Sequence, residues 1–204
     1  MDGVTVGGVG DLRDIYGSPS DKAVRKQLSR LDGHCRNFIG LSPFLVLGTS
    51  GADGADCSPR GDAPGFVAVL DERTLLIPDR LGNNRIDSLT NVTVNPSVAL
   101  IFFVPGINET LRVNGKASVT VDPGLLAPLA VQDRVPRSGL LITVEQAFFH
   151  CAKALIRSRL WDPDTRIERR SFPSLGRILA DQIADCDAAE ADAVIDEAYK
   201  SKLY

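Results

Sequence analysis

Two arginines in the middle of the chain have the local chemistry of an anion-binding site. Arg85 follows the strand pattern and glycine-containing turn of IPDRLGNNRIDSL, where a helix is predicted to open at Asn83 or Asn84. The backbone N–H groups at a helix N-terminus bind anions, and an arginine in the first turn adds a bidentate donor. This segment therefore predicts a phosphate site. An ion pair of Arg85 with Asp79 or Asp87 is the purely structural alternative.

A second arginine, Arg60, lies in SPRGDAPGF, a predicted loop that leads into the strand pattern GFVAVL. If that strand forms a hairpin with TLLIPD through the turn at 71–73, Phe66 and Pro78 lie at the same end of the pair. Arg60 and the start of the predicted helix at Asn83 would then converge on one ligand.

Composition limits the class of protein to which these arginines belong. The chain has 204 residues, of which 44% are hydrophobic and 24% charged, and its net charge is −3. These values suit one globular domain and give no basic footprint for nucleic acid or an anionic membrane. Without a secretory pattern or an apolar span, a cytoplasmic protein is predicted, and Arg60-Gly61-Asp62 is interpreted as a charged turn instead of an adhesion signal.

The cysteines and histidines predict neither disulfides nor a metal site. Cys35, Cys57, Cys151 and Cys186 are widely separated and are expected to be reduced thiols. The two His-Cys pairs lack the ligand spacing of a zinc site. With only two histidines in the chain, a catalytic triad is not expected either.

The elements that must position the arginines follow from hydrophobic periodicity. A flexible arm is predicted over 1–19, then a helix from Asp21 to about Phe38 with Ser20 as its N-cap. Six strands are predicted, at 43–50, 65–71, 74–79, 97–104, 110–121 and 139–149. Their tight turns favour an antiparallel barrel or sandwich.

Four shorter helices complete the prediction. One interrupts the strands at 83–91 with Ile86 and Leu89 facing inward, and three follow them, at 150–160, 173–185 and 187–200. We therefore expect a single mainly β domain over 20–204 with a C-terminal helical extension.

Residues 58–117 resemble the FMN-binding split barrel of pyridoxamine 5'-phosphate oxidase-related proteins. The resemblance rests on three runs in the same order: SPRGD-PGFV, IPDR-GNNR and LRVNG. The opening helix with SPFLVLGTS and the closing CAKALIRSRLW extend it over about 20–200. It implies a mainly β fold with flanking helices, namely an antiparallel six-stranded split β-barrel, with FMN as cofactor. It also implies a homodimer with the flavin site at the subunit interface.

The resemblance also implies which residues contact the flavin. The family's strand-end contact corresponds to Pro78 and Asp79, and its phosphate-binding helix start to the segment around Arg85. The implied set is Arg60, Pro78, Asp79, Asn83, Asn84, Arg85, Thr110 and Arg112, with Lys153, Arg157 and Trp161 expected from the partner subunit.

The chain departs from the oxidase itself where that enzyme binds substrate. The oxidase's substrate lysine corresponds to Ala68, its Arg-x-His motif is absent from IRSRLWDPD, and the loop at 122–138 does not reproduce its substrate pattern. We therefore expect an FMN-dependent oxidoreductase that acts on NAD(P)H or another small molecule, with no catalytic residue assigned. A non-catalytic flavin carrier or sensor, and a split barrel that binds haem or F420, are the alternatives.

Overall fold

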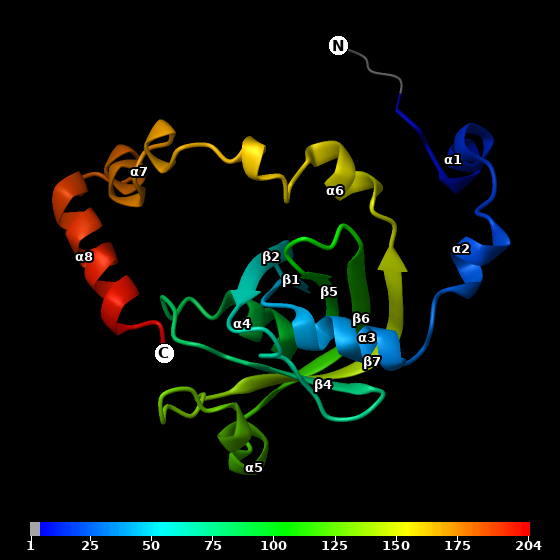
Figure 1. Ribbon diagram of the computed structural model, residues 1–204, viewed down its shortest axis with the longest axis horizontal. Helices are drawn as coiled ribbons and strands as arrows, with labels where there is room; N and C mark the ends of the chain where they lie inside the picture. The colour runs from blue at the N-terminus through cyan, green and yellow to red at the C-terminus, as the bar shows by residue number, and fades with distance from the viewer. Residues whose placement is uncertain (1–4) are drawn as a thin grey trace.

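The computed structural model describes residues 5–204 (Figure 1). It contains one antiparallel sheet of seven strands in the order β2-β1-β5-β6-β7-β4-β3. The strands are β1 Phe44–Gly51, β2 Gly54–Gly61, β3 Ala68–Val69, β4 Thr74–Pro78, β5 Ser97–Phe103, β6 Thr110–Thr120 and β7 Gly139–His150. Buried side chains alternate with more exposed ones along β1 and β5, because successive side chains of a strand point to opposite faces. The predicted mainly β fold with flanking helices is confirmed, with seven strands instead of six.

Strand β2 corrects the prediction of a loop around Arg60. It pairs with β1 alone, at the edge of the sheet, and sets Arg60 opposite Leu45. Its sequence GADCSPRG has no hydrophobic alternation, and none of its residues is buried. An edge strand of this kind is held by backbone hydrogen bonds, so its side chains leave no pattern in the sequence.

The predicted hairpin that brings Phe66 and Pro78 together is confirmed. Ala68 pairs with Leu76 and Val69 with Leu75, so the two chain segments run antiparallel from the turn at 71–73. Only two residues of the predicted strand 65–71 have strand geometry.

The helices are shorter and more numerous than predicted. They are α1 Val9–Tyr16, α2 Asp21–Arg25, α3 Gly33–Leu41, α4 Asp87–Val94, α5 Pro123–Leu126, α6 Lys153–Ser158, α7 Leu175–Gln182 and α8 Ala188–Ser201. Three short 3-10 helices lie at Ala127–Leu129, Pro163–Thr165 and Arg169–Ser171. The expected arm over 1–19 thus contains a helix, α1, which has no buried residue, and residues 1–4 of the arm lie outside the described range.

The predicted helix from Asp21 to Phe38 is divided in two. Ser20 does cap α2, since its side chain accepts a hydrogen bond from the backbone N–H of Ala23 at 3.3 Å. Between α2 and α3 the chain is extended, and the backbone of Leu28 exchanges two hydrogen bonds with Ala147 of β7. This pairing with the sheet overrides the helical periodicity of the segment.

Helix α4 begins later than predicted, at Asp87 instead of Asn83 or Asn84. Asn84 and Ile86 have left-handed backbones with φ of 59° and 52°, so no helix can run through them. Arg85 therefore lies in the turn before the helix. Ile86 is 57% exposed, contrary to the prediction that it faces inward, whereas Leu89 packs against the core as expected.

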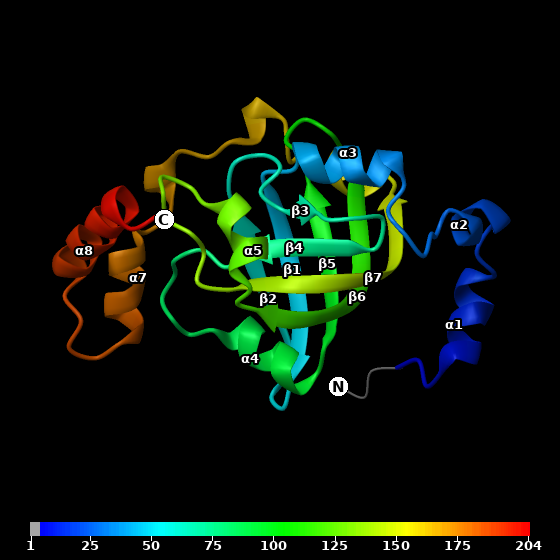
Figure 2. The same cartoon turned by 90° about the horizontal axis from the view of Figure 1, so that it is seen from below.

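The core fills the space enclosed by the sheet and is covered at one end by α3 (Figure 2). Phe38 and Ile39 of α3 are buried there with Leu100 and Phe102 of β5. Phe38 meets Phe149 of β7 edge-on, with 5.3 Å between ring centroids. The ends of β2 and β4 carry the candidate site.

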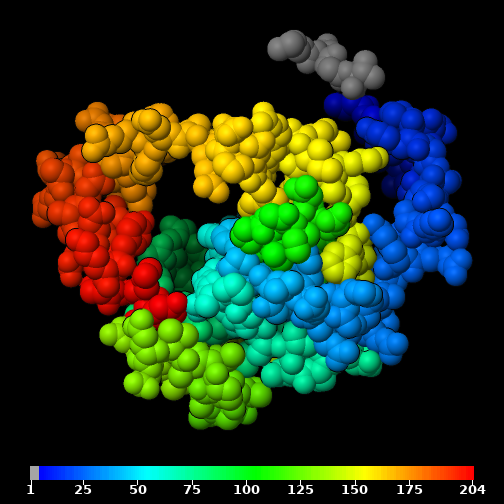
Figure 3. All heavy atoms as spheres, in the orientation of Figure 1, coloured from blue at the N-terminus to red at the C-terminus, as the bar shows by residue number. Residues whose placement is uncertain are grey.

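After β7 the chain leaves the sheet through α6 and forms a helical arm, α7 and α8, which packs mainly on itself. The space-filling view leaves an open gap between this arm and the sheet (Figure 3), and the chain returns to the sheet only after α8. Among residues 5–204, no helix has both the length and the apolar character needed to cross a membrane.

Candidate functional site

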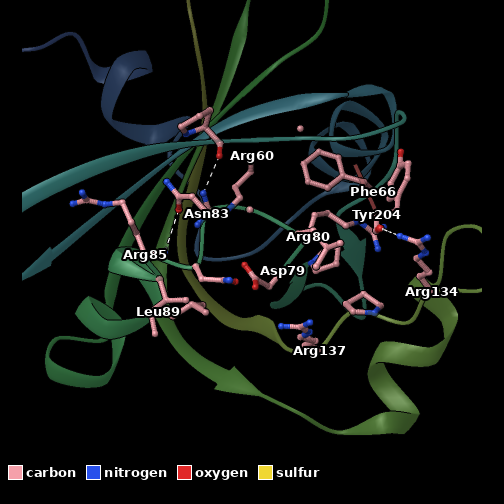
Figure 4. Close-up of a pocket in the computed structure, with 18 of the residues that line it drawn as sticks. Arg60, Phe66, Asp79, Arg80, Asn83, Arg85, Leu89, Arg134, Arg137 and Tyr204 are labelled. Carbon is pink, nitrogen blue, oxygen red and sulfur yellow. Dashed lines mark hydrogen bonds between the residues drawn. The ribbon is translucent and has the colours of Figure 1, made fainter. Parts of the chain in front are cut away.

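A cavity of about 850 Å³ lies where the ends of β2 and β4 meet the segment before α4 (Figure 4). It brings together six of the residues implied by the resemblance: Arg60, Pro78, Asp79, Asn83, Asn84 and Arg85. Arg60 is the next-to-last residue of β2, and Pro78 ends β4 with Asp79 directly after it. The turn with left-handed residues carries Asn83, Asn84 and Arg85 past the opening. The expected convergence of Arg60 with the segment before α4 is therefore present in the fold.

The other five implied residues lie outside this cavity in the single chain. Thr110 is 3% exposed within β6, and the guanidinium of Arg112 lies 4.8 Å from the ring centroid of Phe148. The indole N–H of Trp161 donates to the backbone oxygen of Ile107 at 2.8 Å. The remaining two are Lys153 and Arg157, both exposed on α6. The expected contribution of Lys153, Arg157 and Trp161 from a partner subunit stays a prediction.

Arg60 is half-buried and carries a charge that no carboxylate pairs with among residues 5–204. Its Nη1 donates to Ser58 Oγ at 2.9 Å and to the backbone oxygen of Pro59 at 2.8 Å. Burial lowers the pKa of Arg60, partly opposed by the nearby charges of Asp79 and Asp56. A buried charge without a close partner favours binding of an anion, which would restore the lost solvation.

Asp79 lies in the same cavity, and burial raises the pKa of its carboxyl group. The charge of Arg60 acts in the opposite direction and limits this rise. The backbone N–H of Asp79 donates to Ser138 at 2.9 Å, which fixes the end of β4 against the start of β7.

Arg85 is largely exposed and forms the ion pair with Asp87 that the sequence left open, with 2.8 Å between Nε and Oδ2. This hydrogen bond, together with the charge of Asp87, raises the pKa of Arg85. The backbone N–H of Arg85 donates to the side chain of Asn83 at 3.1 Å, which stabilises the turn before α4. Arg85 therefore contributes an exposed positive charge at the rim, in contrast to the half-buried charge of Arg60.

The opposite side of the cavity contains four residues that the sequence analysis missed: Arg80, Arg134, Arg137 and Tyr204 (Figure 4). Arg80 ends the run IPDR, where its positive charge beside a strand end was the available signal. Arg134 and Arg137 come from the loop before β7. Tyr204 follows α8, and nothing in its local sequence indicates a site.

Arg80 is held by Asp62, the acidic residue of the Arg-Gly-Asp tripeptide. Arg80 Nε lies 2.7 Å from Asp62 Oδ2, and the two side chains are 17% and 3% exposed. Arg80 Nη1 also donates to the backbone oxygen of Leu129 at 2.8 Å. Burial alone would raise the pKa of Asp62, but hydrogen bonds from Tyr204, the backbone of Ala63 and Arg80 outweigh it and lower the pKa.

More positive than negative side chains line the cavity, although the chain is acidic. Five arginines and two aspartates line it: Arg60, Arg80, Arg85, Arg134 and Arg137 against Asp79 and Asp87. Such a local excess of positive charge with backbone turns at the rim suits a phosphate or another anion.

The family model described as pyridoxamine 5'-phosphate oxidase matches residues 31–151 of this chain. The matched range contains every residue that lines the cavity except Tyr204. No curated protein matches the chain.

Several solved structures are similar to this chain at low sequence identity. A crystal structure of a single-residue variant of HupZ from Group A Streptococcus has a TM-score of 0.50 at 15% identity and covers 59% of this chain and 99% of its own. General stress protein 26 from Bacillus anthracis has a TM-score of 0.42 at 16% identity, with coverages of 57% and 93%. An FMN-binding protein from Syntrophomonas wolfei has a TM-score of 0.43 at 7% identity, with coverages of 70% and 97%.

Proposed function

Because the chain belongs to the pyridoxamine 5'-phosphate oxidase family, we propose that its cavity binds FMN and holds the phosphate group at Arg60. The family match confirms the resemblance noted in the sequence, and with the antiparallel sheet it establishes the split β-barrel fold. The observation that carries the proposal is the half-buried, unpaired charge of Arg60 at the end of β2, judged over residues 5–204.

The residues of the cavity suit such a ligand. Its volume of about 850 Å³ lies within the range of ligand pockets in proteins. Arg60 and Arg85, with the polar turn at Asn83 and Asn84, would bind the phosphate, and the main chain at Pro78 and Asp79 would contact the ring. Charge-assisted hydrogen bonds from arginine are the strong contacts that phosphate oxygens form in proteins.

The proposed activity is oxidation and reduction of a small molecule or of NAD(P)H. When bound, FMN supplies the hydride-transfer chemistry, so the protein has to bind and orient the ring and limit access of water. Stopped-flow reduction of the FMN-loaded protein by NADH and NADPH tests this activity. Fast reduction by one of them supports an oxidoreductase, whereas slow reduction by both supports a flavin carrier or sensor.

The cofactor itself is tested by absorption spectroscopy of the purified protein. The near-ultraviolet and blue bands of oxidised flavin are expected, or they appear after FMN is added and the excess removed. Protein that is colourless and does not retain added FMN would show the proposal to be wrong. A Soret band or the F420 spectrum would point to the alternative ligands.

A homodimer is proposed from the outer face of β6 and β7. Arg112 Nε and Asn114 Oδ1 are buried there without a hydrogen-bond partner among residues 5–204. Unsatisfied buried polar atoms are costly, so contact with further polar groups is favoured. A second copy on this face would supply such groups and bring Thr110 and Arg112 to the subunit interface, as the resemblance implies.

Multi-angle light scattering is expected to give twice the 21.9 kDa mass of the chain. The dimer should persist at the concentrations used for flavin titration, because the site is proposed to need both subunits. A stable monomer that still retains flavin tightly would contradict this prediction.

We expect Arg85→Ala to weaken FMN binding by a few-fold and Arg112→Ala to weaken it less. Arg85 lines the cavity but is exposed and already paired with Asp87, which limits what a phosphate contact can add. Arg112 lies outside the cavity of its own chain. Fluorescence titration measures both affinities, and an Arg85→Ala protein with the wild-type affinity would refute the role assigned to Arg85.

A further inference from the structure

Tyr204 reaches the cavity from a part of the chain that otherwise has little contact with the sheet. Its hydroxyl group donates a hydrogen bond to Asp62 Oδ1 at 2.7 Å, and the Arg80 guanidinium lies 5.7 Å from its ring centroid. Its backbone oxygen accepts a hydrogen bond from Arg134. One residue thus links the end of β2, the end of β4 and the loop before β7 (Figure 4).

The arm that carries Tyr204 is a stiff helical hairpin. Asp192 of α8 accepts hydrogen bonds from Ser174 Oγ at 2.6 Å and from the backbone N–H of Gly176 at 2.7 Å. A Cβ atom at Gly176 would lie 2.5 Å from the backbone oxygen of Ala188, so the two helices are in close contact. Helices α7 and α8 therefore form one packed unit.

The hydroxyl of Tyr204 attaches this arm to the cavity by a hydrogen bond to a charged group. Its acceptor, Asp62, has a side chain that is 3% exposed and ionised in its pair with Arg80. Hydrogen bonds to buried charged groups are stronger than those between neutral groups. The cation–π contact with Arg80 adds to this attachment.

With Tyr204 in place, the cavity of about 850 Å³ is still present, so the residue forms part of the wall and does not fill the space. We propose that Tyr204 is a latch that closes the Arg80 end of the cavity and slows the release of bound ligand. This inference rests on the proposed function insofar as the ligand is FMN. The contacts of Tyr204 with Asp62, Arg80 and Arg134 do not depend on the identity of the ligand.

Tyr204→Phe tests the latch, because it removes the hydroxyl group and leaves the ring. We expect FMN to dissociate about tenfold faster from this variant after dilution of the loaded protein, as the fluorescence of released FMN reports. Hydrogen–deuterium exchange should also accelerate in the backbone of residues 131–137, with or without FMN. Tyr199→Phe is the matched control, because Tyr199 is 59% exposed on α8 and is expected to leave both measurements unchanged.

The outcomes separate the latch from the proposed function. If Tyr204→Phe releases FMN and exchanges its amide hydrogens at the wild-type rates, the latch is wrong. Slower release of FMN would also overturn the latch, because it would mean that Tyr204 competes with the ligand. If the wild-type protein binds no FMN, the proposed function is wrong, and exchange in residues 131–137 alone decides the latch. An unchanged urea midpoint in Tyr204→Phe would show that faster release does not come from a loss of global stability.

Discussion

Replacing Arg60 by glutamine is expected to weaken FMN binding about 10- to 150-fold, which corresponds to about 1.5–3 kcal/mol for a lost charge-assisted hydrogen bond. Arg60 is half-buried at the end of β2, so its contact with a phosphate is shielded from solvent and salt. Glutamine keeps a polar, uncharged side chain on an edge strand with no buried residue, so the variant removes the charge with little change in the fold. Calorimetric titration with FMN measures the effect.

Arg25→Gln is the control for this prediction. Arg25 belongs to α2, its side chain is 78% exposed, and it pairs with Asp21 away from the cavity. The same loss of one charge there should leave the affinity for FMN unchanged. An Arg60→Gln protein that binds FMN as tightly as Arg25→Gln does would refute phosphate binding at Arg60.

Replacing Asp62 by asparagine is expected to destabilise the protein by about 3 kcal/mol, because it leaves the charge of Arg80 buried without its partner. The two side chains are 3% and 17% exposed, and Asp62 also accepts from Ala63 and Tyr204. Urea denaturation measures the difference in the free energy of unfolding. A shift below about 0.5 kcal/mol would show that the pair adds no more than an exposed ion pair does.

Asp181→Asn is the matched control, since Asp181 pairs with Arg177 at 2.8 Å but its side chain is 55% exposed. Its effect is expected to stay below about 1 kcal/mol.

The contribution of Asp62 should also depend on pH. Because folding lowers its pKa, that contribution is present above the pKa of the unfolded state and is lost as the pH falls through the lower pKa of the folded state. The difference in stability between wild type and Asp62→Asn should therefore shrink in this acidic range.

The parts of the fold that could be predicted are those in which hydrophobic side chains alternate. The runs that became β1, β5, β6 and β7 bury alternate residues over much of their length, and their bounds were predicted to within a few residues. The edge strand β2 buries none, so the same reasoning placed Arg60 in a loop. The helix that was predicted to open at Asn83 fails for a local reason, since Asn84 and Ile86 have left-handed backbones that no periodicity reveals.

In the candidate site, too, short-range features could be predicted from the sequence and long-range contacts could not. The hairpin of β3 and β4 is a short-range feature, and it sufficed to predict that Arg60 and the segment before α4 would meet. Arg134 and Tyr204 reach the cavity through tertiary contacts across 70 residues and more of chain. Neither contact has a local signal in the sequence. The pairing of Asp62 with Arg80 likewise depends on the tertiary contact between the residues that follow β2 and those that follow β4.

The central claim is that the cavity recognises FMN through its phosphate at Arg60, and parallel titrations of flavin-free protein with FMN and with riboflavin test it most directly. Riboflavin has the same ring and lacks the phosphate, so the ratio of the two affinities isolates the contacts of that group. We predict that FMN binds at least about tenfold more tightly than riboflavin, and that this preference shrinks in Arg60→Gln. Equal affinities for the two flavins, or no binding of either, would contradict the account.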